Sequence, residues 1–254
     1  MISLDSVSKD FGGVHAVKGL SMTVAAGSLT GLIGPNGAGK TTVLNLMTGL
    51  TRPSTGHVVF KDRRIERMRP HRIAALGVAR TYQTTRLFGR MTALENVVAG
   101  MHLAAEDSLF GHLICWPPTL RQVRRLRRAA REHLAELGMA ERAEIEARNL
   151  ANGEQRRVEL ARVIATGAAL LLLDEPAAGL NPNETAALRD EIKRLVRERG
   201  ITVLLVEHDM ALVMSACDRI VVLNFGEKIA EGSPAQVRSD PRVIEAYLGA
   251  QAPA

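Results

Sequence analysis

The sequence predicts an α/β fold in which parallel strands alternate with helices, and two observations support this prediction. The stretch 34–42 fits the pattern G-x-x-x-x-G-K-[ST] and lies between a short expected strand at 28–33 and a helix. Much later, the aliphatic run 168–173 leads directly into Asp174 and Glu175. Such a run is typical of a parallel strand buried on both faces. With 254 residues, the chain is long enough for one large α/β domain.

Composition and charge narrow the class of protein. The formal net charge is +6, which is compatible with nucleic acid, anionic lipid headgroups or an acidic partner. No apolar run approaches the roughly 20 residues that span a bilayer, and Met1–Asp5 lacks the pattern of a signal peptide. We therefore expect a cytoplasmic soluble protein. Cys115 and Cys217 are too few for a metal or redox motif and are expected to be buried thiols.

The first thirty residues are expected to form strands. Residues 2–30 alternate in polarity, with one turn at 11–13 and another at 26–27. Phe11 lies in the first turn, and aromatic residues make up only 3% of the chain. Its ring either stacks on a nucleotide base or anchors the turn.

The loop at 34–42 is expected to hold nucleotide phosphates. Its glycines allow a tight turn that brings backbone N–H groups against phosphate oxygens. Lys40 supplies positive charge to the β- and γ-phosphates, and the Thr41 hydroxyl is a ligand for Mg²⁺. The helix that follows presents its N-terminus, which favours an anion. The predicted phosphate site comprises Gly34, Pro35, Asn36, Gly37, Ala38, Gly39, Lys40, Thr41 and Thr42.

The next segment continues the strands. We expect strands at 57–60 and 77–82, separated by a charged loop and short helix at 63–72. Gln83 follows the second of these strands directly. A lone glutamine there is either a solvated turn residue or part of a site at the strand end.

From about residue 92 to 150 the pattern is helical. An amphipathic helix is expected at 119–138, with most of its arginines off the apolar stripe. That basic face is either a solvated surface or one that attracts lipid headgroups or nucleic acid; no aromatic residues interleave to stack on bases. The apolar segment 109–116 is either an exposed docking patch or part of a local helical core.

The last hundred residues return to the α/β pattern. Asn152 and Gly153 suit the start of a helix that ends near 167, and a further helix is expected at 181–200. A strand at 201–206 runs into His208, which is either a surface residue or part of a site. A hairpin at 220–230 and a mixed helix and coil tail from 234 complete the chain.

Four polar features each follow an expected strand directly: the loop at 34–42, Gln83, Asp174 with Glu175, and His208. Ligands of open α/β sheets bind outside the carboxyl ends of the strands. The four features are therefore expected to converge on one nucleotide.

These motifs, in this order, resemble the nucleotide-binding subunits of ABC transporters over essentially the whole chain. Residues 34–42 match Walker A, 170–174 match Walker B, and 178–181 match the D-loop. The resemblance implies a P-loop NTPase fold with an antiparallel β region and a helical subdomain. It divides a single domain, 1–254, into a core at 1–82 and 156–235, a helical subdomain at 83–155 and a tail at 236–254.

The resemblance also assigns roles to residues. Glu175 polarises the attacking water, His208 holds the γ-phosphate, and Gln83 serves both catalysis and the Mg²⁺ shell. Thr41 and Asp174 are the other Mg²⁺ ligands. Phe11 and Val17 fall where the family contacts the adenine of ATP. The signature residues, expected to contact the ATP of an opposing subunit, are Asn152, Gly153 and Glu154.

Finer motifs resemble the subfamily that imports branched-chain or other hydrophobic amino acids, among them residues 79–83, 207–210 and 243–249. The implied partners are a second homologous or identical ATPase subunit, two transmembrane permease subunits and, indirectly, a periplasmic or surface substrate-binding protein. No nucleic acid is expected. The implied location is peripheral, at the cytoplasmic face of the plasma membrane. A urea or amide importer and a soluble, non-transport ABC ATPase are the alternatives.

One position departs from the family pattern. The signature Leu-Ser-Gly-Gly-Gln is here Leu150-Ala151-Asn152-Gly153-Glu154, so Ala151 lacks the hydroxyl expected to reach an opposing γ-phosphate. Losing one hydrogen bond to a charged group costs about 1.5–3 kcal/mol. We therefore expect that the ATP site completed by this signature hydrolyses slowly or mainly binds.

Overall fold

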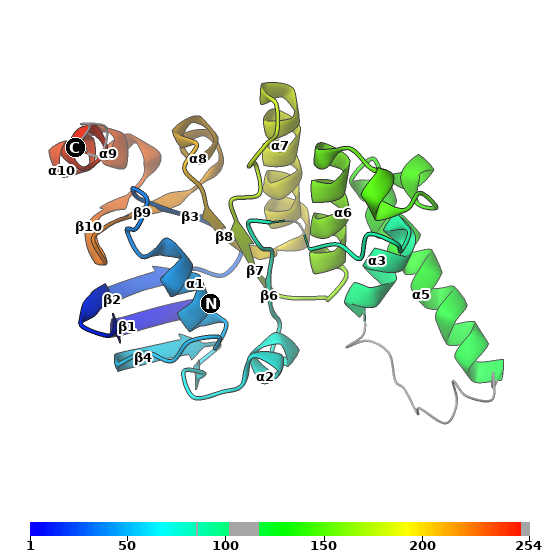
Figure 1. Ribbon diagram of the computed structural model, residues 1–254, viewed down its shortest axis with the longest axis horizontal. Helices are drawn as coiled ribbons and strands as arrows, with labels where there is room; N and C mark the ends of the chain where they lie inside the picture. The colour runs from blue at the N-terminus through cyan, green and yellow to red at the C-terminus, as the bar shows by residue number, and fades with distance from the viewer. Residues whose placement is uncertain (85, 102–116, 250–254) are drawn as a thin grey trace.

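A computed structural model describes residues 1–84, 86–101 and 117–249 and contains two sheets (Figure 1). The first is antiparallel, with the order β2-β1-β4-β5. Its strands are β1 (Ile2–Phe11), β2 (Val14–Val24), β4 (Thr55–Phe60) and β5 (Arg63–Arg64). The second has the order β10-β9-β3-β8-β7-β6 and is parallel except for β10. Its strands are β3 (Leu29–Ile33), β6 (Val78–Arg80), β7 (Leu170–Asp174), β8 (Thr202–Val206), β9 (Arg219–Asn224) and β10 (Glu227–Gly232).

Helices cover the parallel sheet and build a lateral subdomain. Around the sheet lie α1 (Lys40–Met47), α2 (Pro70–Ala75), α7 (Pro182–Arg199), α8 (Met210–Ala216), α9 (Pro234–Ser239) and α10 (Pro241–Gly249). The subdomain consists of α3 (Ala93–Gly100), α5 (Pro117–Glu136), α6 (Asn152–Ile164) and two 3₁₀ turns, Ala140–Arg142 and Ala147–Asn149. Figure 1 shows α5 at the edge of the molecule farthest from β10.

The central strands explain why this sheet is the core of the molecule. Every residue of β3, β7 and β8 is buried, as expected for aliphatic strands covered on both faces. Their side chains alternate between two clusters. Leu171 and Leu173 pack with the helices, whereas Leu170 and Leu172 pack with α1 and the antiparallel sheet. Burial on both faces holds the carboxyl ends of the strands in register, and those ends carry the polar residues.

The helical subdomain is stabilised internally by a buried amide. Asn96 of α3 is fully buried, and its side chain accepts from the Phe88 N–H and donates to the Phe88 and Thr92 carbonyls. Thr92 and Glu95 form a complete capping box at the start of α3. These bonds order segment 88–92 against α3, close to the chain that leads away from Gln83.

The element pattern expected from sequence is largely confirmed. The expected strands and helices are all present, with ends that coincide or differ by up to three residues: the strands around 28–33, 57–60, 168–173 and 201–206, the hairpin at 220–230 and the helices at 152–167 and 181–200. The charged segment 63–72 departs from the expectation, because its first two residues pair with β4 as β5. Segment 109–116, Cys115 and the end of the tail lie outside the described residues. Cys217 is buried as expected, and burial raises its pKa to about 12.

No helix within residues 1–84, 86–101 and 117–249 has both the length and the apolarity required to cross a membrane.

Candidate functional site

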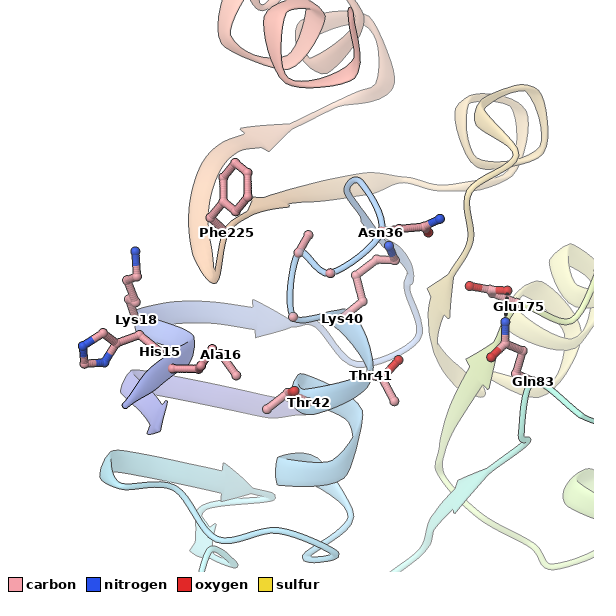
Figure 2. Close-up of a pocket in the computed structure, with 14 residues that line it drawn as sticks. His15, Ala16, Lys18, Asn36, Lys40, Thr41, Thr42, Gln83, Glu175 and Phe225 are labelled. Atoms are coloured by element: carbon pink, nitrogen blue, oxygen red, sulfur yellow. Dashed lines mark hydrogen bonds between the residues drawn. The ribbon is translucent and has the colours of Figure 1, made fainter. Parts of the chain in front are cut away.

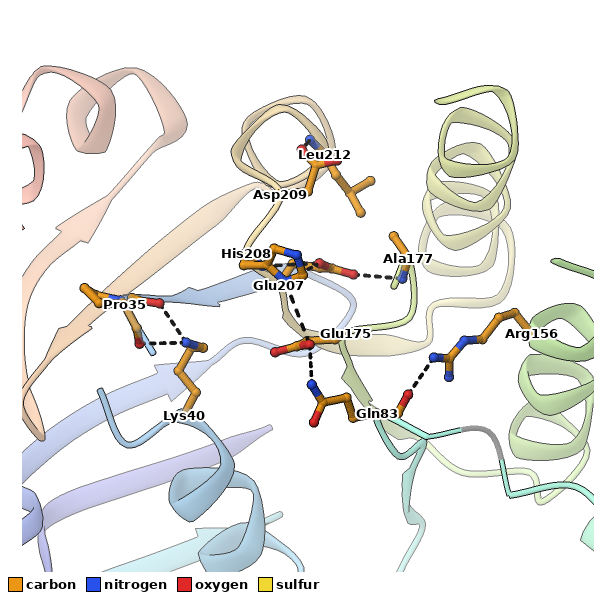
Figure 3. Close-up of polar contacts among 11 residues, drawn as sticks. Pro35, Lys40, Gln83, Arg156, Glu175, Ala177, Glu207, His208, Asp209 and Leu212 are labelled. Atoms are coloured by element: carbon orange, nitrogen blue, oxygen red, sulfur yellow. Dashed lines mark hydrogen bonds and ion pairs between the residues drawn. The ribbon is translucent and has the colours of Figure 1, made fainter. Parts of the chain in front are cut away.

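The phosphate loop lies between β3 and α1, as the sequence predicts. Gly39 has a φ of 103° and leads into α1, whose first residue is Lys40. The Lys40 Nζ donates to the carbonyls of Gly34 at 2.7 Å and Pro35 at 3.0 Å (Figure 3). Burial lowers the pKa of Lys40, and the nearby carboxylates of Glu175 and Asp174 act in the opposite direction. A charged ammonium group held inside the loop is suited to phosphate oxygens.

The glycines of this loop are required by its neighbours as well as by its turn. A Cβ on Gly34 would lie 2.1 Å from the Leu223 carbonyl oxygen at the end of β9. A Cβ on Gly39 would lie 2.4 Å from the Ala16 carbonyl oxygen in β2. Both glycines also have positive φ angles. The phosphate loop is therefore held tightly between a strand of each sheet.

The groups expected at the strand ends do lie together. The Gln83 side-chain amide, after β6, donates to Glu175 Oε2 at 2.7 Å. His208, after β8, has its Nδ1 3.8 Å from the same oxygen (Figure 3). Glu175 has a φ of 47°, an unusual backbone conformation for a residue other than glycine, and its N–H donates to the Val206 carbonyl at 2.8 Å. The backbone bond to β8 helps to hold this carboxylate at the mouth of the site.

Asp174 is held by a partner that the sequence did not reveal. Its carboxylate accepts from Arg80 Nη2 at 2.8 Å, and both side chains are more than 90% buried. Arg80 Nη1 donates to the Asn45 side-chain oxygen in α1 at 2.6 Å. The Asp174 N–H donates to the Thr81 hydroxyl. Arg80 thus links β6, β7 and α1, the helix that follows the phosphate loop.

Glu207 is a second buried carboxylate beside the site. It precedes His208, is fully buried, and accepts from the Ala177 N–H at 2.8 Å. It also accepts from the His208 N–H at 3.2 Å. Burial raises the pKa of Glu207, while these backbone donors lower it. The side chain ties the turn after Glu175 to the turn that carries His208.

A pocket of about 620 Å³ opens over the phosphate loop (Figure 2). Gln83 and Glu175 lie at one end, Lys40 and Thr41 at the centre, and Phe225 across the loop from Glu175. The lining residues are Val14, His15, Ala16, Lys18, Asn36, Gly37, Ala38, Gly39, Lys40, Thr41, Thr42, Gln83, Glu175 and Phe225. The pocket thus extends from the strand-end residues Gln83 and Glu175 over the phosphate loop to the turn at Phe225.

Two residues predicted to contact the base lie outside this lining. Phe11 is at the end of β1, and the Lys9 Nζ lies 4.8 Å from the centre of its ring. Val17 is fully buried in the core, although its neighbours Ala16 and Lys18 line the pocket. The roles given to Phe11 and Val17 remain predictions, and Phe225 lines the pocket although the sequence did not suggest it.

Comparisons with known proteins identify the fold and the family. A family model described as "ABC transporter" matches residues 17–178. The chain belongs to the ABC transporter family. A second family model, "Branched-chain amino acid ATP-binding cassette transporter", matches residues 227–253. The predicted P-loop NTPase fold of the ABC type is therefore confirmed, and the chain is an ABC ATPase that takes ATP as its nucleotide.

Curated relatives match the chain along its whole length. The "High-affinity branched-chain amino acid transport ATP-binding protein LivG" of Escherichia coli (strain K12) is 44% identical over 98% of both chains. The corresponding BraF protein of Pseudomonas aeruginosa is 43% identical over 98% of both chains. The "Lipopolysaccharide export system ATP-binding protein LptB" of Acidithiobacillus ferridurans is 34% identical, over 99% of this chain and 98% of that protein.

Solved structures agree with this assignment. The ADP conformation of MJ1267, an ATP-binding cassette of an ABC transporter, is 31% identical over 98% of both chains, with a TM-score of 0.85. The dimeric structure of MJ0796, a bacterial ABC transporter cassette, is 26% identical over 92% of this chain and 99% of that chain, with a TM-score of 0.79.

The signature of this ABC ATPase lies at the start of α6, away from its own pocket. Ala151 has the extended backbone of an N-cap, but its methyl group offers no cap to the helix. Glu154 Oε2 accepts from the Ala151 N–H at 3.0 Å, and Glu154 Oε1 accepts from Arg142. Gly153 is buried, and a Cβ added there would lie 2.5 Å from Glu184 Oε1 of α7. Asn152, Gly153 and Glu154 thus form a separate surface.

Arginines of α6 connect that surface to the segment after Gln83. Arg156 donates to the Gln83 carbonyl at 2.6 Å (Figure 3). It also donates to the Tyr82 carbonyl at 3.2 Å. Arg162 donates to the Arg86 carbonyl at 2.7 Å. The signature helix and the chain that carries Gln83 are therefore joined by direct hydrogen bonds.

Proposed function

We propose that this ABC ATPase powers the uptake of branched-chain or other hydrophobic amino acids. The observation that carries the proposal is the match of residues 227–253 to the branched-chain family model. The full-length similarity to proteins named for branched-chain amino-acid transport supports it. The relative named for lipopolysaccharide export is less similar to this chain, so an export function has weaker support than amino-acid uptake.

The site has the groups needed for hydrolysis of the γ-phosphate. Lys40 and the N–H groups at the start of α1 bind the phosphates, and Glu175 orients the attacking water and accepts its proton. Gln83 holds the Glu175 carboxylate through the 2.7 Å bond, and His208 approaches the same oxygen. Phosphoryl transfer is catalysed mainly by positioning and by neutralising charge, so few covalent steps are required of the protein.

The residues also fit a magnesium ion. Because the Gln83 amide nitrogen donates to Glu175, its amide oxygen is left as an acceptor, and the Thr41 hydroxyl lines the same pocket. Both are oxygen donors of the kind that Mg²⁺ prefers, whereas the Asp174 carboxylate is paired with Arg80 and does not line the pocket. In this proposal Thr41 and Gln83 hold the ion, whose charge offsets that of the phosphates, and the role of Asp174 as a ligand remains a prediction.

The active unit in this proposal contains two ATPase subunits. The signature residues at the start of α6 belong to the helical subdomain and do not line the chain's own pocket. A second subunit, identical or homologous, brings its signature to the ATP held by Lys40. The dimer reported for another bacterial cassette supports this arrangement.

Membrane subunits complete the assembly that we propose. The subdomain, given the bounds 83–155 from sequence, is the part that contacts two permease subunits. Arg156 and Arg162 lie farther along α6, beyond those bounds, and their hydrogen bonds to the segment after Gln83 offer a route by which such contact reaches Glu175. The protein then lies at the cytoplasmic face of the plasma membrane, and a substrate-binding protein acts from the opposite side.

The test is uptake by the reconstituted transporter. The chain is assembled in proteoliposomes with the ATPase, membrane and binding proteins encoded beside it, and ATP-dependent uptake of labelled leucine, urea and acetamide is measured. We expect leucine uptake that disappears when Glu175→Gln replaces the wild type. Uptake of urea or acetamide without leucine would assign the alternative importer class, and a chain that binds no membrane subunit would indicate a soluble ATPase.

A further inference from the structure

The helix α5, at the outer edge of the helical subdomain, carries positive charge along one side. Its exposed arginines form a surface that we term the α5 basic face: Arg121, Arg124, Arg125, Arg128 and Arg131. They recur at intervals of three and four residues, and residues at those intervals are neighbours on the surface of a helix. None of the five lines the pocket over the phosphate loop, so the proposed hydrolysis of ATP leaves them without a role.

The positive charge of this helix is only partly neutralised within the described residues. Arg131 Nη2 lies 2.6 Å from Glu144 Oε1, and Arg127 Nη2 lies 3.7 Å from the other oxygen of the same carboxylate. Arg124 and Arg128 have no ion-pair partner in the part of the chain that the structure describes. Like charges one turn apart repel each other and weaken a helix. The isolated chain gains nothing from this arrangement, whereas an anionic partner would relieve the repulsion.

A groove of about 610 Å³ lies beside these arginines. It is lined by α5 and by Ala140 of the first 3₁₀ turn. Four guanidinium groups line it together with one carboxylate, that of Glu132: Arg124, Arg127, Arg128 and Arg131. Guanidinium groups bind phosphate oxygens through paired N–H donors. The groove therefore suits a ligand that carries phosphate groups.

The chemistry of this surface favours lipid headgroups over a protein or a nucleic acid. Protein interfaces are centred on large apolar or aromatic anchors, whereas the apolar residues that line the groove are alanines, at 135 and 140. No phenylalanine, tyrosine or tryptophan occurs in 117–136 to stack on bases. A cluster of about four to eight basic residues on an amphipathic helix is, by contrast, typical of proteins that bind anionic lipids. Figure 1 also shows α5 at the outer edge of the subdomain, where neighbouring elements leave it accessible.

We propose that the α5 basic face binds the phosphate groups of anionic phospholipids at the surface of the membrane. This inference rests on the proposed function, because assembly with permease subunits brings the helical subdomain to the membrane. It goes beyond that function by giving the ATPase a direct contact with the lipid bilayer. The contact is electrostatic and confined to the headgroups, since this face presents arginines rather than large apolar side chains. It therefore weakens as the salt concentration rises.

Sedimentation of the full chain with lipid vesicles measures this contact. Vesicles that contain phosphatidylglycerol are compared with vesicles of phosphatidylcholine alone, and we expect binding to the former that decreases with added salt. A basic residue close to an anionic membrane strengthens binding about fivefold. Arg124→Gln combined with Arg128→Gln, the groove variant, is therefore expected to lower the partition coefficient about 25-fold.

A matched control removes the same charge from other surfaces. Arg64→Gln combined with Arg238→Gln replaces two exposed arginines, one on β5 and one on α9, that have no ion-pair partner among the described residues. Figure 1 shows α9 at the end of the molecule opposite to α5. We expect this control to bind phosphatidylglycerol vesicles as well as the wild type does. Glutamine and arginine have similar helix propensities, so the groove variant is expected to keep the melting temperature of the wild type.

Three results would overturn the proposal. The first is a wild-type chain that binds phosphatidylglycerol vesicles no better than phosphatidylcholine vesicles. The second is an equal loss in the groove variant and the control, which would mean that net charge alone attracts the chain. The third is a groove variant that keeps vesicle binding but loses binding to duplex DNA or to the permease subunits, which would assign the face to that partner. Failure of leucine uptake by the reconstituted transporter would instead refute the proposed function and leave the vesicle result standing.

Discussion

Replacing Ala151 with serine is expected to stabilise the protein by completing a helix cap. The Ala151 backbone already has N-cap angles, with φ −64° and ψ 158°. Half of a capping box is present, because Glu154 accepts from the Ala151 N–H at 3.0 Å. The missing half is a side-chain oxygen at residue 151 that accepts from the Glu154 N–H.

The same chain contains the completed form of this cap. At the start of α7, the Asn181 side chain accepts from the Glu184 N–H at 3.0 Å, and Glu184 accepts from the Asn181 N–H at 3.0 Å. The value of such a cap oxygen over alanine is typically about 1 kcal/mol. For a chain of this size that corresponds to a rise in the melting temperature of roughly 2–4 °C. We therefore expect Ala151→Ser to raise the melting temperature by that amount.

Thermal unfolding of the isolated chain, followed by circular dichroism, measures this effect. Ala135→Ser is the matched control, because it makes the same chemical change at an exposed position within α5. There serine is expected to lower stability by about 0.5 kcal/mol through its weaker helix propensity. A melting temperature of Ala151→Ser at or below that of the wild type would refute the reasoning about the cap.

The same substitution has a second consequence in the assembled transporter. A hydroxyl at residue 151 adds one hydrogen bond to the γ-phosphate of the opposing site, worth about 1.5–3 kcal/mol when made to a charged group. We expect Ala151→Ser to raise the ATPase rate of the complex. An unchanged ATPase rate would refute the hypothesis that Ala151 impairs the opposing ATP site.

Two further predictions concern buried charges. Arg80→Ala leaves the buried Asp174 carboxylate without its ion-pair partner and is expected to destabilise the chain by about 3–5 kcal/mol in urea unfolding. The control Arg242→Ala breaks an exposed ion pair and should leave the urea midpoint of the wild type unchanged. Equal urea midpoints for the two variants would contradict this prediction. Burial raises the pKa of Glu207 in the folded chain above its unfolded value of 4.5. The folded state therefore binds the proton more tightly than the unfolded state does. As pH rises above about 4.5, the contribution of Glu207 to the free energy of unfolding falls. The stability of Glu207→Gln relative to the wild type should therefore increase between pH 5 and pH 8, and a difference that is constant over that range would contradict the assigned shift.

The sequence predicted the phosphate site well because the signals there are local. The spacing of Gly34, Gly39 and Lys40 fixes a loop that needs no distant information. The convergence of Gln83, Glu175 and His208 was also predictable, since each follows a strand and parallel strands end at one edge of a sheet. The structure brings these three side chains together around Glu175 Oε2.

The parts that sequence did not predict depend on contacts between distant residues. Arg80 and Asp174 are 94 positions apart, and their pairing follows from the adjacency of β6 and β7. Phe225 looked like an ordinary turn residue, and its place in the pocket lining follows from the packing of β9 against Gly34 of the phosphate loop. The two-residue strand β5 is too short to leave a periodic signal.

The central claim is that hydrolysis at the Glu175 site drives amino-acid uptake. Its most direct test measures ATP hydrolysis by the reconstituted transporter with and without leucine and its binding protein. We predict a rate that leucine increases in the wild type, and a loss of at least 100-fold in Glu175→Gln with ATP binding retained. A rate that does not respond to leucine, or a Glu175→Gln complex that hydrolyses ATP as fast as the wild type, would contradict the account.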